Sequence, residues 1–271
     1  MCYRYFISNS DQIKNIEHPT DDFQFFITNN ERYNNVQREA MHSTSITKPS
    51  TPLLTISSIA CIRNEVVTRL ASLNVHPLYL PNLSSQKPSG TAHLPILTTN
   101  PTTLRSKSRI IVIVNRSAED LAIWAYRILS KSGGINSGSA VAFVKEAVTR
   151  SEEYGAGEEE VPGFIILNPG QLLYSHKHER AMTTVAWDAL PRKSATHPMP
   201  RVDPMHNRIP GNRTAEDHVA FVFDKVVGSP EFVNPDAQIY IIGLGDGGDE
   251  VIKYLEKNCT FLLAPHGPPH Y

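Results

Sequence analysis

The sequence has few cysteines and no long apolar run. Its three cysteines, Cys2, Cys61 and Cys259, lie far apart. Their number and spacing argue against a disulfide framework or a clustered zinc motif, and they favour a reducing, intracellular compartment. No apolar stretch approaches the roughly 18 residues of a membrane-spanning helix, and the first residues, MCYRYF, lack the apolar stretch of a signal peptide. We therefore expect a soluble intracellular protein that contacts no membrane.

The sequence also lacks an excess of either charge. Its 271 residues include 26 Lys and Arg against 27 Asp and Glu, a formal net charge of −1, which argues against a uniformly basic coat for nucleic acid. Hydrophobic residues make up 40% and charged residues 20% of the chain, and these proportions are those of a globular protein. At roughly 100–200 residues per domain, the length allows one large domain or two small ones.

The first hundred residues are uneven in composition. Residues 21–41 and 60–74 have helical spacing, whereas residues 43–58 are rich in Ser, Thr and Pro and predict a linker. Residues 76–80 are typical of a short strand, and residues 82–107 predict an irregular connection. We therefore expect an N-terminal helical and extended segment and a following α/β domain, or one continuous domain. The expected ranges are 1–98 and 99–271.

Apolar runs alternate with helical patterns in the second part of the chain. Four runs show no polar alternation, which is typical of strands buried on both faces; they span residues 110–114, 164–167, 239–242 and 261–264. The stretches with helical spacing are residues 117–129, 137–149, 214–227 and 249–257. This alternation predicts an α/β fold with a mostly parallel sheet, whose site lies at the carboxyl ends of the strands.

A glycine-rich turn, GLGDGG at residues 243–248, follows the third apolar run. Gly243, Gly245 and Gly248 have the spacing of a dinucleotide-binding turn. The acidic residue that binds the ribose about 20 positions later is absent, and the next helix begins with two acidic residues that repel a pyrophosphate. We therefore expect no nucleotide and no other cofactor.

The same turn has the spacing of a nucleophile elbow, in which small residues stand two positions before and after the nucleophile. With Gly243 and Gly247 as the small residues, Gly245 takes the position of the nucleophile, and glycine has no side chain that can attack. Asp246 is one position late and is a weak catalytic candidate. Because the acidic residues downstream of the turn all lie on the following helix, none is placed to serve as the acid of a triad, and we expect no catalytic residues here. The elbow residues are Gly243, Gly245, Asp246, Gly247 and Gly248.

A long stretch with little periodicity, residues 168–213, precedes the helix predicted at 214–227, and loops of this length are often functional. Its second half has five basic residues against one acid, Asp203; they are Arg192, Lys193, Arg201, Arg208 and Arg213. Two interpretations are open. The basic residues could bind a phosphate, an RNA strand or an acidic partner surface, or they pair with the acidic residues 158–160 in a solvated loop.

Histidines in this part of the chain are a weaker signal. His176 and His178 share a face if they lie on a strand, and His206 or His218 could join them. No second pair of ligands has a recognisable zinc spacing, so we expect no metal. A capping box at the start of the helix would leave His218 to pack or form hydrogen bonds beneath the loop.

Several motifs follow one another in a familiar order. They are NPGQL at 168–172, WDALPR at 187–192, NRIPGN at 207–212, the turn at 243–248, and the N-terminal piece at 5–41. On these motifs the chain resembles fungal members of the Arb-two (Argonaute-binding protein two) domain family over most of its length, with residues 43–58 departing from it. The family includes fungal Argonaute-binding proteins of the Argonaute siRNA chaperone complex and animal relatives. A related domain follows the catalytic domain of some fungal class II histone deacetylases.

The resemblance implies a three-layer α/β-hydrolase-like fold, in which some relatives carry serine where this chain has Gly245. It implies a non-catalytic binding protein whose partner is an Argonaute-type protein or a chaperone-complex subunit, with small RNA held indirectly. The implied setting is small-RNA-directed heterochromatin silencing in the nucleus. The alternative is an esterase with a non-standard nucleophile, Asp246.

Overall fold

The computed structural model describes residues 3–7, 56–129, 134–191, 194, 196, 198 and 200–258. The chain divides into two compact units, one made of Met1–Ser8 with Thr55–Tyr271 and one made of Asn9–Leu54. All described residues belong to the first unit. The helix predicted at 21–41, most of the linker predicted at 43–58 and the strand predicted at 261–264 lie outside the described residues.

One six-stranded sheet, in the order β1-β8-β4-β5-β3-β2, forms the centre of the described unit. β1, β8, β4 and β5 run parallel, whereas β3 runs antiparallel to both of its neighbours. A short hairpin of β6 and β7 follows β5. The strands are β1 (Tyr3–Ile7), β2 (Val75–Leu80), β3 (Leu94–Thr99), β4 (Arg109–Val114), β5 (Gly163–Leu167), β6 (Leu173–Ser175), β7 (Arg180–Met182) and β8 (Gln238–Gly243).

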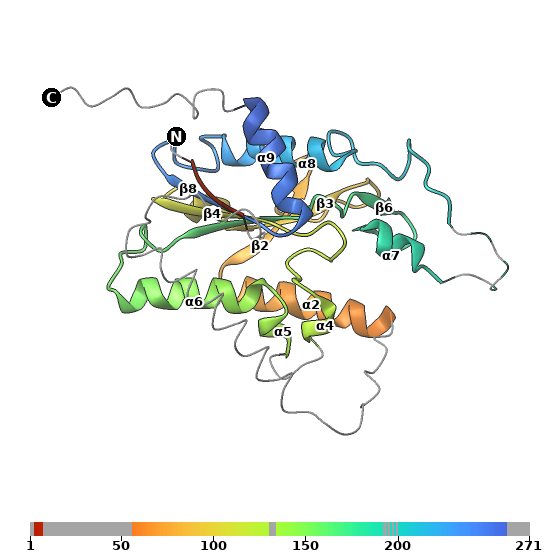
Figure 1. Ribbon diagram of the computed structural model, residues 1–271, viewed down its shortest axis with the longest axis horizontal. Helices are drawn as coiled ribbons and strands as arrows, with labels where there is room; N and C mark the ends of the chain where they lie inside the picture. Colours follow the sequence, from red (N-terminus) through yellow and green to blue (C-terminus); the bar gives the residue numbers. More distant parts are fainter. Residues whose placement is uncertain are drawn as a thin grey trace, which may run out of the picture. The chain divides into compact units, whose positions relative to one another are not determined.

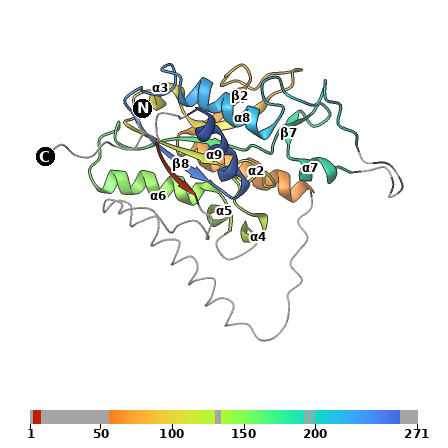
Figure 2. The ribbon, with the colours of Figure 1, turned by 45° about the horizontal axis from the view of Figure 1, so that its top comes forward.

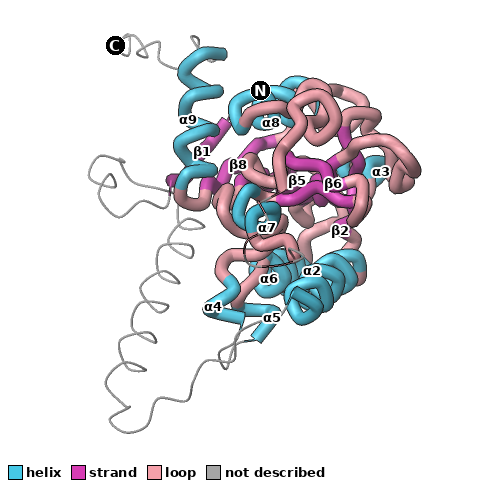
Figure 3. The backbone as a smooth tube through the Cα atoms, turned by 90° about the vertical axis from the view of Figure 1, so that its right-hand side faces the viewer, coloured by secondary structure: helices cyan, strands magenta, loops and turns pink. Residues whose placement is uncertain are grey.

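Helices cover both faces of this sheet (Figure 1). α2 and α6 lie on one face, and α8 and α9 lie on the other, as Figure 3 shows from the side. Each face has its own cluster of buried apolar side chains. The helices are α2 (Ile56–Ala71), α3 (Pro101–Leu104), α4 (Tyr126–Leu129), α5 (Gly134–Ser137), α6 (Ala140–Glu153), α7 (Thr184–Asp188), α8 (Ala215–Val222) with a π-helical turn (Phe223–Val227), and α9 (Asp246–Asn258).

The apolar runs of β4 and β5 form the buried centre of the sheet, as predicted, whereas β8 is buried only at alternate residues. In β4, every residue from Ile110 to Val114 is buried, and all of β5 is buried. A strand covered on both faces has no solvent-exposed side, so its sequence needs no polar alternation. The structure also confirms the helices predicted at 60–74, 137–149, 214–227 and 249–257 and the strand predicted at 76–80, with shifted ends.

Two predictions for local structure are wrong. Residues 82–107 contain β3 and α3 rather than an irregular connection, because pairing with β2 and β5 stabilises a strand whose composition is a poor signal. Residues 117–129 are not one helix; only α4 at its end is helical. The buried Asn115 side chain donates to the carbonyls of Asp120 and Ile123 at 3.1 and 3.0 Å, and these bonds hold a loop.

The sequence pattern did not predict β1 or the β6–β7 hairpin. β1 pairs in parallel with β8, and the β6–β7 hairpin lies within the stretch predicted as a long loop. The single sheet takes strands from both sides of residue 98, and the boundary expected there falls within β3. The division into residues 1–98 and 99–271 stays a prediction.

Candidate functional site

The glycine turn lies between β8 and α9, at the carboxyl end of the parallel strands. Gly245 is exposed and has a φ of +55°, in the left-handed region that favours glycine. Two backbone hydrogen bonds close the turn, from Gly247 N to Leu244 O at 3.1 Å and from Gly248 N to Gly245 O at 2.9 Å. The chain thus reverses from strand to helix within Leu244 and Gly245.

The neighbouring glycines allow close backbone contacts. A Cβ atom on Gly247 would lie 2.2 Å from the carbonyl oxygen of Asn115, and one on Gly243 would lie 2.3 Å from the Cα of Gly248. At Gly245 a Cβ atom would meet only the Arg116 side chain, at 3.5 Å or more. The positions beside the turn therefore exclude side chains, whereas position 245 has room for one.

Asp246 connects this turn to the loop that follows β4. Its Oδ1 accepts a hydrogen bond from the backbone N–H of Ser117 at 3.1 Å. The residue before Ser117, Arg116, is exposed and is the side chain nearest to the Gly245 turn. A backbone N–H that points towards the turn is thus bound by a carboxylate of the chain itself.

The loop after β5 packs against the same loop. A Cβ atom on Gly170 would lie 2.0 Å from the Ser117 carbonyl oxygen. The buried Asn168 side chain donates to the carbonyl of Glu119 at 2.5 Å, and the buried Gln171 side chain accepts from the N–H of Leu121 at 2.9 Å. The carboxyl ends of β4, β5 and β8 therefore meet in one place, and the NPGQL motif positions the loop beside the turn.

A buried charged cluster lies behind this loop, and sequence reasoning missed it. Asp120 Oδ2 accepts from Arg63 Nη1 at 3.1 Å and from the Tyr126 hydroxyl at 2.5 Å. The Asp120 side chain is only 5% exposed, and its Oδ1 has no hydrogen-bond partner among the described residues. Arg63 is 57 positions away in the sequence, so no local spacing points to this pair.

Burial controls the ionisation of this cluster. It raises the pKa of the Tyr126 hydroxyl, and the neighbouring charge of Asp120 raises it further, so Tyr126 stays a hydrogen-bond donor. Burial also raises the pKa of Glu119 and lowers the pKa of Arg180, a second positively charged group near Asp120. Separating a largely buried ion pair leaves an uncompensated charge and is therefore costly. The cluster thus holds α2 against the loop beside the turn.

The family model of the Arb2 domain matches residues 3–263. The chain belongs to the Arb2 domain family. No curated protein and no solved structure matches the chain.

The predicted basic residues of this Arb2 domain differ in their exposure. Arg201 and Arg213 are exposed, whereas Arg208 is half-buried and donates to the carbonyl oxygen of Arg213 at 2.8 Å. Arg192 and Lys193 lie outside the described residues. The acidic residues 158–160 have other neighbours, since their backbone carbonyls accept from the side chains of residues 107–109.

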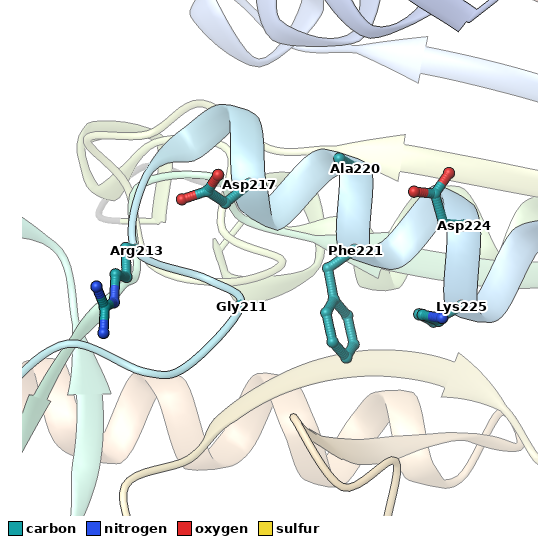
Figure 4. A pocket seen from close by; sticks show the side chains of 7 residues that line it. All are labelled: Gly211, Arg213, Asp217, Ala220, Phe221, Asp224 and Lys225. Carbon is teal, nitrogen blue, oxygen red and sulfur yellow. The ribbon is translucent and has the colours of Figure 1, made fainter.

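A hollow that is lined in part by Gly211 and Arg213 is open and has mixed charge (Figure 4). Its volume is about 310 Å³, and Arg213 and Lys225 line it together with Asp217 and Asp224. Phe221 forms its apolar part. With two charges of each sign, the hollow offers a phosphate no net attraction.

The histidines occupy separate places in the Arb2 domain. His176 and His178 lie in the β6–β7 turn rather than on a strand face, and His206 pairs with Asp203 at 2.8 Å. His218 is fully buried; its Nδ1 lies 2.7 Å from Asn212 Oδ1, and burial lowers its pKa to about 3. Within the described ranges, no group of three His, Cys, Asp or Glu side chains is arranged to hold a metal.

The described helices include none that is both long and apolar enough to span a bilayer.

Proposed function

We propose that this Arb2 domain is a non-catalytic, hydrolase-like binding protein that acts with an Argonaute-type protein. The observation that carries the proposal is the turn at Gly245, together with membership of the Arb2 family. The proposal also includes a fungal origin, a nuclear location and a role in small-RNA-directed heterochromatin silencing. These parts of it rest on the resemblance.

The topology supports a hydrolase-like scaffold. The main sheet takes five strands from this part of the chain: β2, β3, β4, β5 and β8. Numbered 1 to 5 along the chain, they lie across the sheet in the order 1-2-4-3-5, and strand 2 runs antiparallel to its neighbours. A sharp strand-to-helix turn follows the fifth strand, at the place where α/β-hydrolases carry their nucleophile. The glycines at 243 and 247 are required by the same close contacts that make small residues necessary around such a nucleophile.

The chemistry of the turn supports a non-catalytic role. Hydrolases of this fold use a backbone N–H from the loop after the third strand as an oxyanion-hole donor, and Ser117 follows the third strand of this series, β4. In this chain the backbone N–H of Ser117 already donates a hydrogen bond to the negatively charged carboxylate of Asp246. Gly245 has no attacking atom, and the neighbouring carboxylate repels a developing oxyanion.

The partner proposal is tested by co-purification. The tagged full-length chain is isolated from its native cells, with and without ribonuclease, and bound proteins are identified by mass spectrometry. We expect an Argonaute-type protein or a chaperone-complex subunit that survives ribonuclease, because the proposal places RNA in contact only with the partner. Recovery of neither, or loss of every partner with ribonuclease, contradicts it.

The second candidate is an esterase that uses Asp246. One observation favours it: the Asp246 carboxylate is exposed at the carboxyl ends of the strands, beside Arg116. Ester hydrolysis is measured for the wild type, for Asp246→Ala and for Glu256→Ala as a control on the far end of α9. Equal, background rates in all three exclude the esterase, whereas a rate lost only in Asp246→Ala establishes it.

A further inference from the structure

Two oppositely charged segments lie at opposite ends of the central strands. The acidic segment, residues 152–160, has five glutamates and no Lys or Arg, and the basic segment, residues 200–213, has three arginines against Asp203. Ser108, at the amino end of β4, donates to the Glu159 carbonyl. Arg208 bridges to Leu173, beyond the carboxyl end of β5. Figures 1 and 2 both show the end of α6 and the loop before α8 on opposite sides of the sheet.

Three of the four large apolar side chains that are exposed among the described residues lie in the same two segments. Among the described residues, the exposed large apolar side chains are Tyr154, Val185, Val202 and Met205. Tyr154 is 85% exposed in the middle of the acidic segment, and Met205 is 78% exposed in the basic segment with Val202 beside Arg201. Exposed aromatic residues, Met and Arg are enriched in protein–protein interfaces.

Hydrogen bonds hold both segments in fixed conformations. In the acidic segment, Lys107 Nζ donates to the Glu158 carbonyl at 2.5 Å. In the basic segment, Trp187 Nε1 donates to the Pro200 carbonyl at 2.9 Å, and the Asn207 side chain donates to the Tyr174 carbonyl at 2.9 Å. Segments that are already ordered lose little conformational entropy when they bind.

We propose that the acidic segment of one copy of this chain docks on the basic segment of a second copy. Their charges are complementary, and their position at opposite ends of the central strands prevents them from meeting within one chain. Tyr154 then packs against Val202 and Met205, and Glu152 and Glu153 face Arg201 and Arg213. Because the two surfaces differ, the contact is head-to-tail and extends to further copies unless the rotation closes a ring.

Charge reversal with rescue tests this contact on the purified full-length chain. Variant A carries Glu152→Lys and Glu153→Lys, which suit the last turn of a helix, and variant B carries Arg201→Glu and Arg213→Glu. The control Glu256→Lys reverses one charge on α9, outside both segments. The mass in solution is measured over a range of protein concentrations, and circular dichroism verifies that each variant is folded.

We expect the wild type and Glu256→Lys to associate beyond the 30.2 kDa of one chain at low salt and to dissociate at about 1 M salt, where the Debye length is about 3 Å. Variants A and B are monomeric alone, and an equimolar mixture associates again because A retains the basic and B the acidic segment. A monomeric wild type, or a mixture of A and B that stays monomeric, overturns the proposal. Neither result bears on the Argonaute-type partner, which is tested in native cells.

Discussion

Single glycines decide whether the turn between β8 and α9 can form. Gly247 lies against the backbone of Asn115, which cannot move aside as a side chain can, whereas Gly245 faces only the flexible Arg116 side chain. The same substitution therefore has different costs at the two positions, although both glycines belong to one turn.

We expect Gly247→Ala to lower the free energy of unfolding by about 3 kcal/mol, because its methyl group overlaps a backbone oxygen. Gly245→Ala is expected to cost only about 1 kcal/mol, the strain of a left-handed φ. Urea unfolding of both variants and the wild type measures the two costs. An equal cost at the two positions would show that the tight contact between α9 and Asn115 is absent.

A single buried histidine makes stability depend on pH. Because the folded pKa of His218 is about 3, against about 6.5 in the unfolded chain, only the unfolded chain takes up a proton between these values. The contribution of neutral His218 to stability is complete above pH 6.5 and is lost as the pH falls towards 3. The free energy of unfolding falls by about 1.4 kcal/mol per pH unit in this range.

The variant His218→Gln keeps an amide donor for Asn212 but does not titrate. Urea unfolding between pH 7 and 4 is therefore expected to give a shallower loss of stability for His218→Gln than for the wild type. His176→Gln, in the exposed β6–β7 turn, serves as the control and should keep the wild-type slope. Parallel pH profiles for all three proteins would contradict a buried, neutral His218.

At the scale of elements, the sequence pattern at the start of α8 correctly predicts a capping box. Thr214 accepts from the N–H of Asp217, and Asp217 accepts from the N–H of Thr214, each at 3.1 Å. This capping box satisfies helix N–H groups that have no partner within α8. α8 must begin at this residue for His218 and Val219 to face the core.

Thr214→Ala is expected to lower the free energy of unfolding by about 1 kcal/mol, the typical loss of a helix cap. Thr214→Ser keeps the accepting oxygen and is expected to stay within about 0.5 kcal/mol of the wild type. Thermal unfolding of the two variants compares them directly. A serine variant as unstable as the alanine variant would mean that the threonine methyl group, and not the cap, contributes the stability.

At the scale of the whole molecule, the sheet determines which parts open last. β4 is paired along both edges by β8 and β5, and its side chains are buried on both faces. β2 pairs with β3 along one edge and is only partly buried. Amide hydrogen exchange is therefore expected to be slowest in β4 and faster in β2, because local opening follows burial and pairing. Faster exchange in β4 than in β2 would contradict this strand order.

The sequence by itself determined the central strands, the long helices, the cap of α8 and the glycine turn. These features depend on residues close together in the chain: β-branched runs for strands buried on both faces, helical spacing for amphipathic helices, and glycines where backbones touch. The motifs also pointed to the Arb2 family, which the family model then matched over residues 3–263.

The tertiary structure alone decided the rest, because the contacts join residues far apart in the chain. β3 forms because β2 and β5 flank it, and the loop at 116–125 replaces a predicted helix because buried amides bind its backbone. The bond between Asp246 and Ser117 spans 129 positions, and that between Arg63 and Asp120 spans 57. Such pairs leave no periodic pattern in a sequence; only the folded sheet and the helices packed on it bring them together.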